Sequence, residues 1–239
     1  MDFIYPVQTD YFKDTGCGTG RFSVCACEFG ASQIVGVDLS ESVEVAFQNT
    51  RHLPNVLIVQ ADLFSMPLRP NFDYAFSVGV LHHTSVPSRA FTAVVNLVRR
   101  GGAVSAWVYG RENNGWIVNF VNPIRKHMTS RLPRSVLLAL AYLMTIPLFL
   151  LLKGIYRPVG KYQSLNWLKK YLFYFDYLYF LSSFGFHEQA YIVFDHLVPV
   201  LAEYITQEDF KKWFTGNQMV NVVITHRHQM SWRGFGERP

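Results

Sequence analysis

Hydrophobic and polar positions along the first 110 residues alternate in blocks whose lengths predict strands and helices in turn. Mostly apolar runs of strand length lie at 34–37, 56–59, 72–79 and 103–109. Between them, apolar residues recur every three or four positions, which is typical of amphipathic helices. Strands that alternate with helices form a parallel sheet with helices on both faces. The strand expected at 11–13 fits least well, because Lys13 suits a buried central strand poorly. Either the start of this fold is shortened or that strand is short and partly exposed.

A second block of the same kind lies near the end of the chain. Thr206 is a good N-cap, and residues 207–214 have the spacing of a helix. Residues 220–225 and 231–235 then predict two strands that can pair as a hairpin. This block is separated from the first by residues 111–205, which the minimal strand–helix pattern does not require.

The stretch from Asp14 to Gly20 reads Asp-Thr-Gly-Cys-Gly-Thr-Gly, with a glycine at every second position. Glycine weakens both helices and strands, so this spacing favours a sharp turn that lets a ligand approach the backbone. Helical spacing follows from Arg21 to Phe29 and stops at Gly30, a suitable C-cap. A helix that starts directly after the glycines points free N–H groups at whatever binds there.

Asp38 ends the apolar run 34–37, eighteen residues after Gly20. An acid at the end of the second strand is placed to accept hydrogen bonds from ribose hydroxyls. Strand, glycine loop, helix, strand and acid together predict a half-domain that binds a nucleoside cofactor.

The glycine loop reads G-x-G-x-G with an acid two residues before the first glycine, whereas the dinucleotide fingerprint is G-x-G-x-x-G. In this it resembles the first motif of the class I S-adenosylmethionine-dependent methyltransferases. Residues 72–83, which end in Leu-His-His, resemble that family's F-D-x-V-x-S-x-x-x-L-H-H segment beside the transferred methyl group. The resemblance covers 11–110 and 206–235 well and the residues between them in outline.

The resemblance implies that S-adenosylmethionine is the cofactor. It places the loop backbone on the methionine part, Asp38 on the ribose, and Asp62 on the adenine amino group. For Asp62, a simple turn cap is the alternative. The residues implied to bind the cofactor are Asp14, Gly16, Cys17, Gly18, Gly20, Asp38, Leu39, Asp62, Leu63, Val78 and Gly79.

Methyl transfer from a sulfonium has an activated leaving group, so positioning of the acceptor can supply most of the catalysis. A general base is needed only if the acceptor must lose a proton. The candidate catalytic residues are His82, His83 and Tyr109, which lie near the ends of the cofactor strands in sequence; each can instead be a core or surface residue. No metal is expected, because adjacent histidines diverge on a regular backbone.

The resemblance also implies the fold class. It is α/β, with a doubly wound, Rossmann-like, mostly parallel seven-stranded sheet, an antiparallel C-terminal hairpin and a helical insertion that acts as a lid. We therefore predict a cofactor-binding core at 1–110, a helical insertion at 111–205, and a helix and strand pair at 206–239 that complete the core.

The insertion contains an uncharged, Leu-rich run at 135–152 that is interrupted by Pro147 and flanked on both sides by basic residues. Its length is at the lower limit for a membrane span, and it lacks the one-sided positive charge typical of one. Three interpretations remain: a hairpin resting on an anionic membrane surface, a lid over a greasy substrate, or a buried cap helix.

Composition narrows the function further. Half of the 239 residues are hydrophobic and 16% are aromatic, which excludes a disordered chain, and the net charge is a mild +5. Cys17, Cys25 and Cys27 have no metal-ligand spacing, so a reduced, cytoplasmic setting is expected.

We therefore predict a methyltransferase with a small, apolar or lipid-like acceptor, cytoplasmic or peripheral to a membrane that residues 135–152 contact. No nucleic-acid partner is expected, because the basic residues cluster around an apolar run and no RNA-binding module is appended. One alternative is a nucleic-acid methyltransferase. Another is a non-catalytic cofactor-binding protein whose short N-terminal segment, residues 1–10, no longer supports activity.

Overall fold

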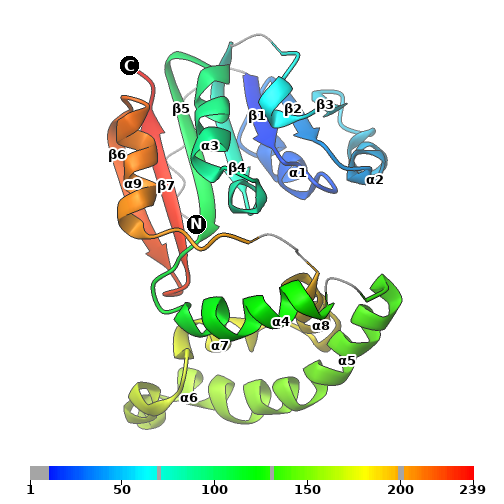
Figure 1. The fold of residues 1–239 in the computed structure, drawn as a ribbon, viewed down its shortest axis with the longest axis vertical. Helices are drawn as coiled ribbons and strands as arrows, with labels where there is room; N and C mark the ends of the chain where they lie inside the picture. The colour runs from blue at the N-terminus through cyan, green and yellow to red at the C-terminus, as the bar shows by residue number, and fades with distance from the viewer. Residues whose placement is uncertain (1–10, 69–70, 130–131, 199–201) are drawn as a thin grey trace. The chain divides into compact units, whose positions relative to one another are not determined.

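The chain folds into two compact units, which Figure 1 shows as a ribbon. The computed structural model describes residues 11–68, 71–129, 132–198 and 202–239. The first unit holds the chain up to Tyr109 together with 205–225 and 232–239. The second unit holds 110–204 and the turn at 226–231. The N-terminal segment 1–10, on which the non-catalytic alternative rests, lies outside the described residues.

The first unit is built on a seven-stranded sheet in the order β3-β2-β1-β4-β5-β7-β6. Its strands are β1 (Tyr11–Thr15), β2 (Gln33–Asp38), β3 (Val56–Gln60), β4 (Phe72–Val78), β5 (Val98–Tyr109), β6 (Val220–Arg227) and β7 (Ser231–Glu237). The first five strands pair in parallel. β7 runs antiparallel to β5, because Gly101 N donates to Arg238 O at one end and Gly110 N to Met230 O at the other. The predicted fold class is confirmed.

Helices cover both faces of this sheet. They are α1 (Arg21–Cys27), α2 (Ser42–Thr50), α3 (Pro87–Leu97) and α9 (Gln207–Gly216), with the short 3₁₀ turns η1 (Leu63–Ser65) and η2 (Leu81–His83). On one face, α3 and α9 bury Phe91, Phe210 and Phe214 against β5 (Figure 1). On the other, Ala26 of α1 packs with Phe12 of β1. The apolar stripes read from the sequence are the surfaces that close these two cores.

β1 is central rather than partly exposed, because it pairs with both β2 and β4. Lys13 is consequently fully buried, with its Nζ 5.7 Å from the centre of the Phe72 ring. Among the described residues this ammonium has no hydrogen-bond partner, and burial lowers the pKa of Lys13 to about 7. The charge of Lys13 led us to expect a shortened start of the fold or a partly exposed strand. β1 is instead central, because backbone hydrogen bonds pair it with a neighbouring strand on each side.

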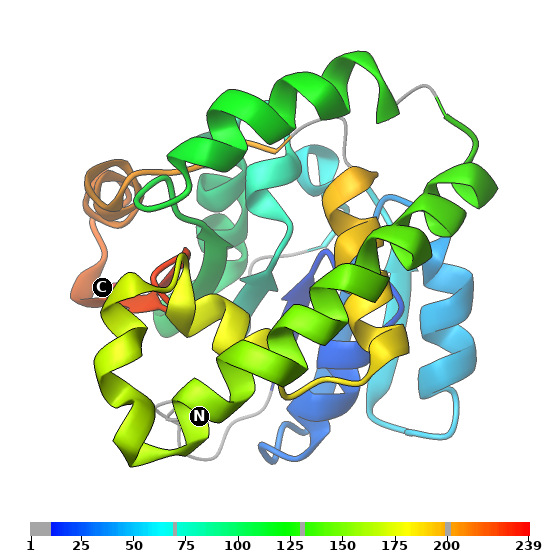
Figure 2. The ribbon, with the colours of Figure 1, turned by 90° about the horizontal axis from the view of Figure 1, so that it is seen from below.

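The second unit is helical. Its segments are η3 (Ile117–Val121), α4 (Asn122–His127), α5 (Arg134–Leu151), η5 (Leu152–Tyr156), α6 (Arg157–Lys161), η6 (Gln163–Tyr171), α7 (Phe175–Leu181) and α8 (Phe186–Leu197). α5 and α8 pack together (Figure 2), with Tyr142 Oη 3.2 Å from His187 Nδ1. Leu152, Tyr156 and Leu181 form a small buried core.

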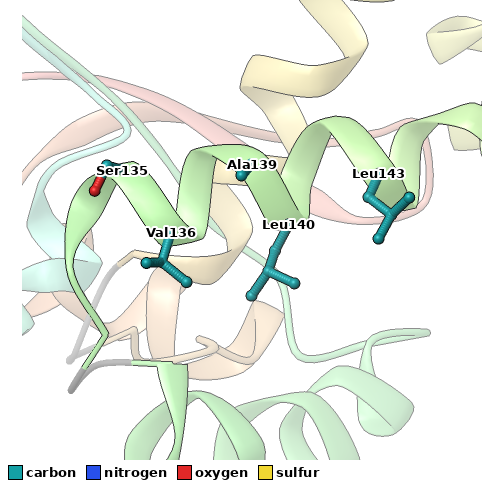
Figure 3. Close-up of a pocket in the computed structure, with 5 residues that line it drawn as sticks. All are labelled: Ser135, Val136, Ala139, Leu140 and Leu143. Carbon is teal, nitrogen blue, oxygen red and sulfur yellow. The ribbon is translucent and has the colours of Figure 1, made fainter.

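The outer surface of α5 stays apolar. Figure 3 shows Val136, Leu140 and Leu143 on one side of the helix, where they line a shallow groove of about 370 Å³ with Ser135 and Ala139. Within the described residues, the continuous helical segment Arg134–Lys161 is long and apolar enough to cross a membrane, and 22% of its most apolar window is buried. One such helix is weak support for a span, because core helices of soluble proteins pass the same test.

Candidate functional site

The glycine loop joins β1 to α1 in the conformation its spacing predicts. Gly16, Gly18 and Gly20 have φ of +76°, +51° and +82°, values that glycine adopts without the strain other residues incur. Gly16 N and Cys17 N donate to Val37 O at 2.7 and 3.0 Å, which fixes the loop against the end of β2. The loop is thus held where the cofactor fold requires it.

The space available for a side chain differs between two glycines of this loop, Gly16 and Gly18. A Cβ at Gly16 would lie 2.3 Å from Val80, so only glycine fits there without a shift. A Cβ at Gly18 would meet no atom within 4 Å. The loop therefore packs on one side against the residues after β4 and is open on the other, as a backbone that cradles a ligand must be.

Asp38 stands at the end of β2 and already holds the neighbouring backbone. Its Oδ2 accepts from Gly18 N at 2.9 Å, and its Oδ1 accepts from Ser40 N at 2.9 Å and Ser40 Oγ at 2.7 Å. An ionised carboxylate offers about four acceptor positions, so capacity remains for a ribose hydroxyl. The three bonds orient the carboxylate beside the glycine loop.

Asp14 is a second carboxylate beside this loop, and it is buried. Its Oδ2 accepts from Ser23 Oγ of α1 at 2.7 Å. Burial, with a further contribution from Asp38, raises the pKa of Asp14 to about 7. The same burial, with both acids nearby, raises the pKa of the Cys17 thiol to about 12, so this cysteine is a neutral packing residue.

A cation bound at the loop would be favoured by these two carboxylates. S-adenosylmethionine carries a sulfonium and an ammonium, so the described residues fit the charge of the cofactor that the resemblance implies. The open face at Gly18 and the oriented carboxylate of Asp38 fit its shape and its ribose.

The remaining cofactor candidates lie at neighbouring strand ends. Asp62 follows β3 and caps η1, because its Oδ1 accepts from Phe64 N at 2.9 Å. Leu39 is 67% exposed beside Asp38, and Leu63 packs on the core. Val78 ends β4, and Gly79 follows it with φ +79°. The turn cap at Asp62 leaves its second carboxylate oxygen available, and its adenine contact stays a prediction.

His82, His83 and Tyr109 come together after β4 and β5. The ring centres of His82 and Tyr109 are 4.1 Å apart, and those of His83 and Tyr109 are 5.8 Å apart. Trp107 joins this aromatic cluster, 5.4 Å from Tyr109 and 6.1 Å from His82. His82 is fully buried, whereas the other three rings are partly exposed. The cluster forms a wall at the carboxyl ends of the strands, where ligands bind in this fold class.

Sequence reasoning missed three residues of this site. Trp107 is two positions before Tyr109 on one strand, so strand periodicity places both on the same face and was the available signal. Ser40 follows Asp38 at the spacing of a local side-chain turn. Ser23 gave no signal, because its bond to Asp14 depends on the packing of α1. Among the described residues, no group of three His, Cys, Asp or Glu can hold a metal ion.

Comparison with known proteins agrees with this geometry. Residues 13–106 match the family described as "Methyltransferase domain". An S-adenosylmethionine-dependent methyltransferase, SibL, in its apo form has a TM-score of 0.55 over 97% of this chain and 51% of its own, at 12% identity. A putative methyltransferase of Haloferax volcanii, solved with the activator Trm112, has a TM-score of 0.55 over 99% of this chain and 86% of its own, also at 12% identity. At that identity both structures establish the fold alone.

Curated relatives have higher identity over a shorter stretch. The chain is 30% identical over 102 residues to the tRNA U34 carboxymethyltransferase of Pseudoalteromonas atlantica, which is 41% of this chain and 32% of that protein. It is 31% identical over 124 residues to the same enzyme of Psychromonas ingrahamii, which is 49% of this chain and 38% of that protein. The matches thus span about a third of the relatives' length.

The fold and the loop with its two acids define a Rossmann-like domain for a nucleoside cofactor. The family match and the fold shared with the solved neighbours agree with S-adenosylmethionine as the cofactor. Residues 13–106 thus match a methyltransferase domain, and the fold is shared with S-adenosylmethionine-dependent methyltransferases of known structure.

The expected partners are corrected by these relatives. The sequence led us to expect a small-molecule acceptor, a membrane contact through 135–152 and no nucleic acid. The curated relatives are instead named for the modification of tRNA. The expectation was wrong because it rested on the absence of an appended RNA-binding module. It also rested more on the apolar run 135–152 than on the basic residues around that run.

Proposed function

We propose that this protein is an S-adenosylmethionine-dependent methyltransferase that modifies RNA. The observation that carries the activity is the convergence of the glycine loop, Asp14 and Asp38 in a methyltransferase domain. The acceptor class rests on the relatives named tRNA U34 carboxymethyltransferase. It is also supported by the basic stretch 113–175, which has nine Lys and Arg residues and no Asp or Glu.

In the proposed reaction the bound cofactor supplies a methyl group on a positively charged sulfur, which is already a good leaving group. The glycine loop, Asp14 and Asp38 would hold this cofactor, and the chemistry it would supply is an in-line displacement in which sulfur would keep the electrons of the broken carbon–sulfur bond. Trp107, Tyr109 and His83 present ring faces on which a base can stack, which would hold the acceptor in line. Such positioning can supply roughly 7–11 kcal/mol of the barrier reduction.

His83 is the residue we propose as general base where the acceptor atom must lose a proton, because its ring is partly exposed whereas His82 is fully buried. The ring centre of His82 lies 4.2 Å from that of His83 and 4.1 Å from that of Tyr109, so His82 packs against both rings. Tyr109 and Trp107 would then hold the acceptor.

The test is transfer of label from methyl-labelled S-adenosylmethionine into unmodified tRNA. Asp38→Ala should weaken cofactor binding by about 1.5–3 kcal/mol, the range for hydrogen bonds to charged groups, and lower transfer at low cofactor concentration. Glu44→Gln removes an exposed carboxylate from α2 and is the matched control, with binding and transfer unchanged. Calorimetry measures cofactor binding separately from transfer. Wild-type protein that binds the cofactor but labels no RNA would contradict the proposed acceptor.

A further inference from the structure

The second unit contains a cavity that the methyl-transfer site does not use. It lies between α7 and the turn that joins β6 to β7, and its volume is about 380 Å³. Its lining residues are Asp176, Tyr179, Phe180, His226, His228 and Gln229. This volume is within the range of about 300–1,000 Å³ that small-ligand sites have.

Four of the lining residues carry rings, and three of these rings take part in stacks. Phe180 and His228 are stacked with their centres 4.3 Å apart and their planes at 19°. Tyr179 stacks on Phe175 at 5.6 Å and 6°, which extends the stacked surface away from the cavity. Flat surfaces of this kind are suited to a nucleobase, because every base has a π-face.

Polar groups lie at the edge of the same cavity. Asp176 and Gln229 are both exposed. A carboxylate accepts hydrogen bonds and an amide both donates and accepts, which is what the edge of an unpaired base requires. His228 and Gln229 have φ of +47° and +53°, so the turn that carries them has a defined, tight conformation.

One lysine lies next to this aromatic surface, and two more lie over tyrosines of the same helical segment. Lys169 Nζ is 5.4 Å from the centre of the Phe175 ring, which itself stacks on Tyr179 of the cavity. Lys170 Nζ is 4.8 Å from the centre of the Tyr171 ring, and Lys161 Nζ is 5.8 Å from that of Tyr162. No Asp or Glu occurs between Glu112 and Asp176 in the sequence. The segment is therefore complementary to a polyanion, and its aromatic residues add stacking to that attraction.

We propose that this cavity holds one unpaired base of a single-stranded RNA segment while the lysines of α6 and η6 bind the flanking phosphates. The proposal rests on the proposed function, and it adds a second RNA contact in the helical unit. An anionic membrane surface would satisfy the lysines. It would gain nothing from a stacked cavity edged by the Asp176 carboxylate, so the observations favour RNA.

The test is binding of fluorescein-labelled, single-stranded 12-nucleotide RNAs, followed by fluorescence anisotropy over a salt series. His228→Asn removes one stacking ring and keeps a residue that tolerates positive φ, and Tyr179→Leu removes another while keeping apolar bulk. Each should weaken binding about 5- to 100-fold, the loss expected for one base–aromatic stack. Asp176→Asn should change the ranking among oligo-A, oligo-C and oligo-U, because the carboxylate can only accept.

Lys169→Gln with Lys170→Gln should reduce the slope of log affinity against log salt by about 1.4, since each phosphate contact on a single strand contributes about 0.7. The matched control is Lys211→Gln with Lys212→Gln, on exposed positions of α9, which should leave the slope unchanged. Circular dichroism and the melting temperature verify that each variant is folded.

The proposal is overturned if both ring variants, folded, bind RNA like the wild type, or if anionic vesicles bind the wild type and displace the RNA through the same lysines. These results differ from failure of the proposed function. If wild-type protein transfers label to tRNA and the ring variants do so at the wild-type Michaelis constant for RNA, the cavity proposal fails while the function stands. Wild-type protein that neither binds nor labels RNA refutes both.

Discussion

The two units differ in how far their large apolar side chains are buried. In the sheet unit, Phe91, Phe210 and Phe214 are completely buried between helices and strands. In the helical unit, Leu143, Leu150 and Trp167 are 63%, 68% and 62% exposed. The helical unit therefore exposes more large apolar and aromatic side chains than the sheet unit, whose exposed examples include Leu39 and Phe47.

Charge follows the same division. The candidate cofactor site of the sheet unit includes the predicted residues Asp14, Asp38 and Asp62, whose charge would suit a cationic cofactor. The helical unit carries nine basic residues and no acid over 113–175. Under the proposed function, the two binding tasks would be divided between the units: the acidic residues beside the glycine loop would suit the cofactor, and the basic helical unit would suit an anionic acceptor.

Core truncation gives the largest expected effect and tests whether the units are independent. Phe91→Ala should destabilise the sheet unit by about 3–5 kcal/mol and Leu152→Ala the helical unit by about 2–5 kcal/mol, because each opens a cavity in a filled core. Urea unfolding followed by hydrogen exchange with mass spectrometry should assign one shifted transition to each variant. Leu143→Ala, at an exposed position, is the control and should change stability by less than about 0.5 kcal/mol. A single transition that both core variants shift equally would show that the units unfold together.

Replacement of the buried Lys13 should have the next largest effect on the free energy of unfolding. It tests how well the core of the sheet unit tolerates a buried charge. The pKa of Lys13 is lowered from 10.5 to about 7, so the folded protein binds fewer protons than the unfolded chain between these values. Stability therefore rises with pH from about 7 to 10.5, and at pH 6 a buried charge must be tolerated. Lys13→Met should raise the free energy of unfolding at pH 6 by roughly 2–4 kcal/mol and by less at pH 10. Urea midpoints at the two pH values measure this difference. An equal gain at both would mean that packing rather than charge is responsible.

A smaller effect, on cofactor affinity, is expected from replacement of Asp14 in the candidate cofactor site of the sheet unit. Its pKa is raised to about 7, so below pH 7 it holds a proton that a bound cation would displace. Cofactor affinity should therefore rise with pH between 5 and 7, by up to about tenfold per unit, and level off above. Asp14→Asn should flatten this dependence and weaken binding at pH 7 by about tenfold. Calorimetry in two buffers of different ionisation enthalpy measures the released proton, and Glu44→Gln, at an exposed position of α2, is the control. A pH profile that Asp14→Asn leaves unchanged would assign the proton to another group.

The periodicity of the sheet unit made most of its fold predictable. The apolar runs at 34–37, 56–59, 72–79 and 103–109 became β2 to β5. β2 and β4 are apolar along most of their length because both of their faces are buried, whereas β3 lies at the edge of the sheet with Leu57 49% exposed. The glycine spacing predicted a sharp turn, and the three glycines of that turn have positive φ. These features are local, so the sequence alone determined them, together with the match of residues 13–106 to a methyltransferase domain.

The tertiary structure decided what depends on partners distant in sequence. Lys13 is buried because two strands flank β1, and Trp107 joins His82 because β4 and β5 are neighbours. The cavity beside Tyr179 exists because residues 226–231 pack with a helix some 50 positions earlier. A local sequence pattern indicates whether a position is buried, but it does not indicate which other residues pack against that position. The identity of the neighbours, and with it the second candidate binding site, required the fold.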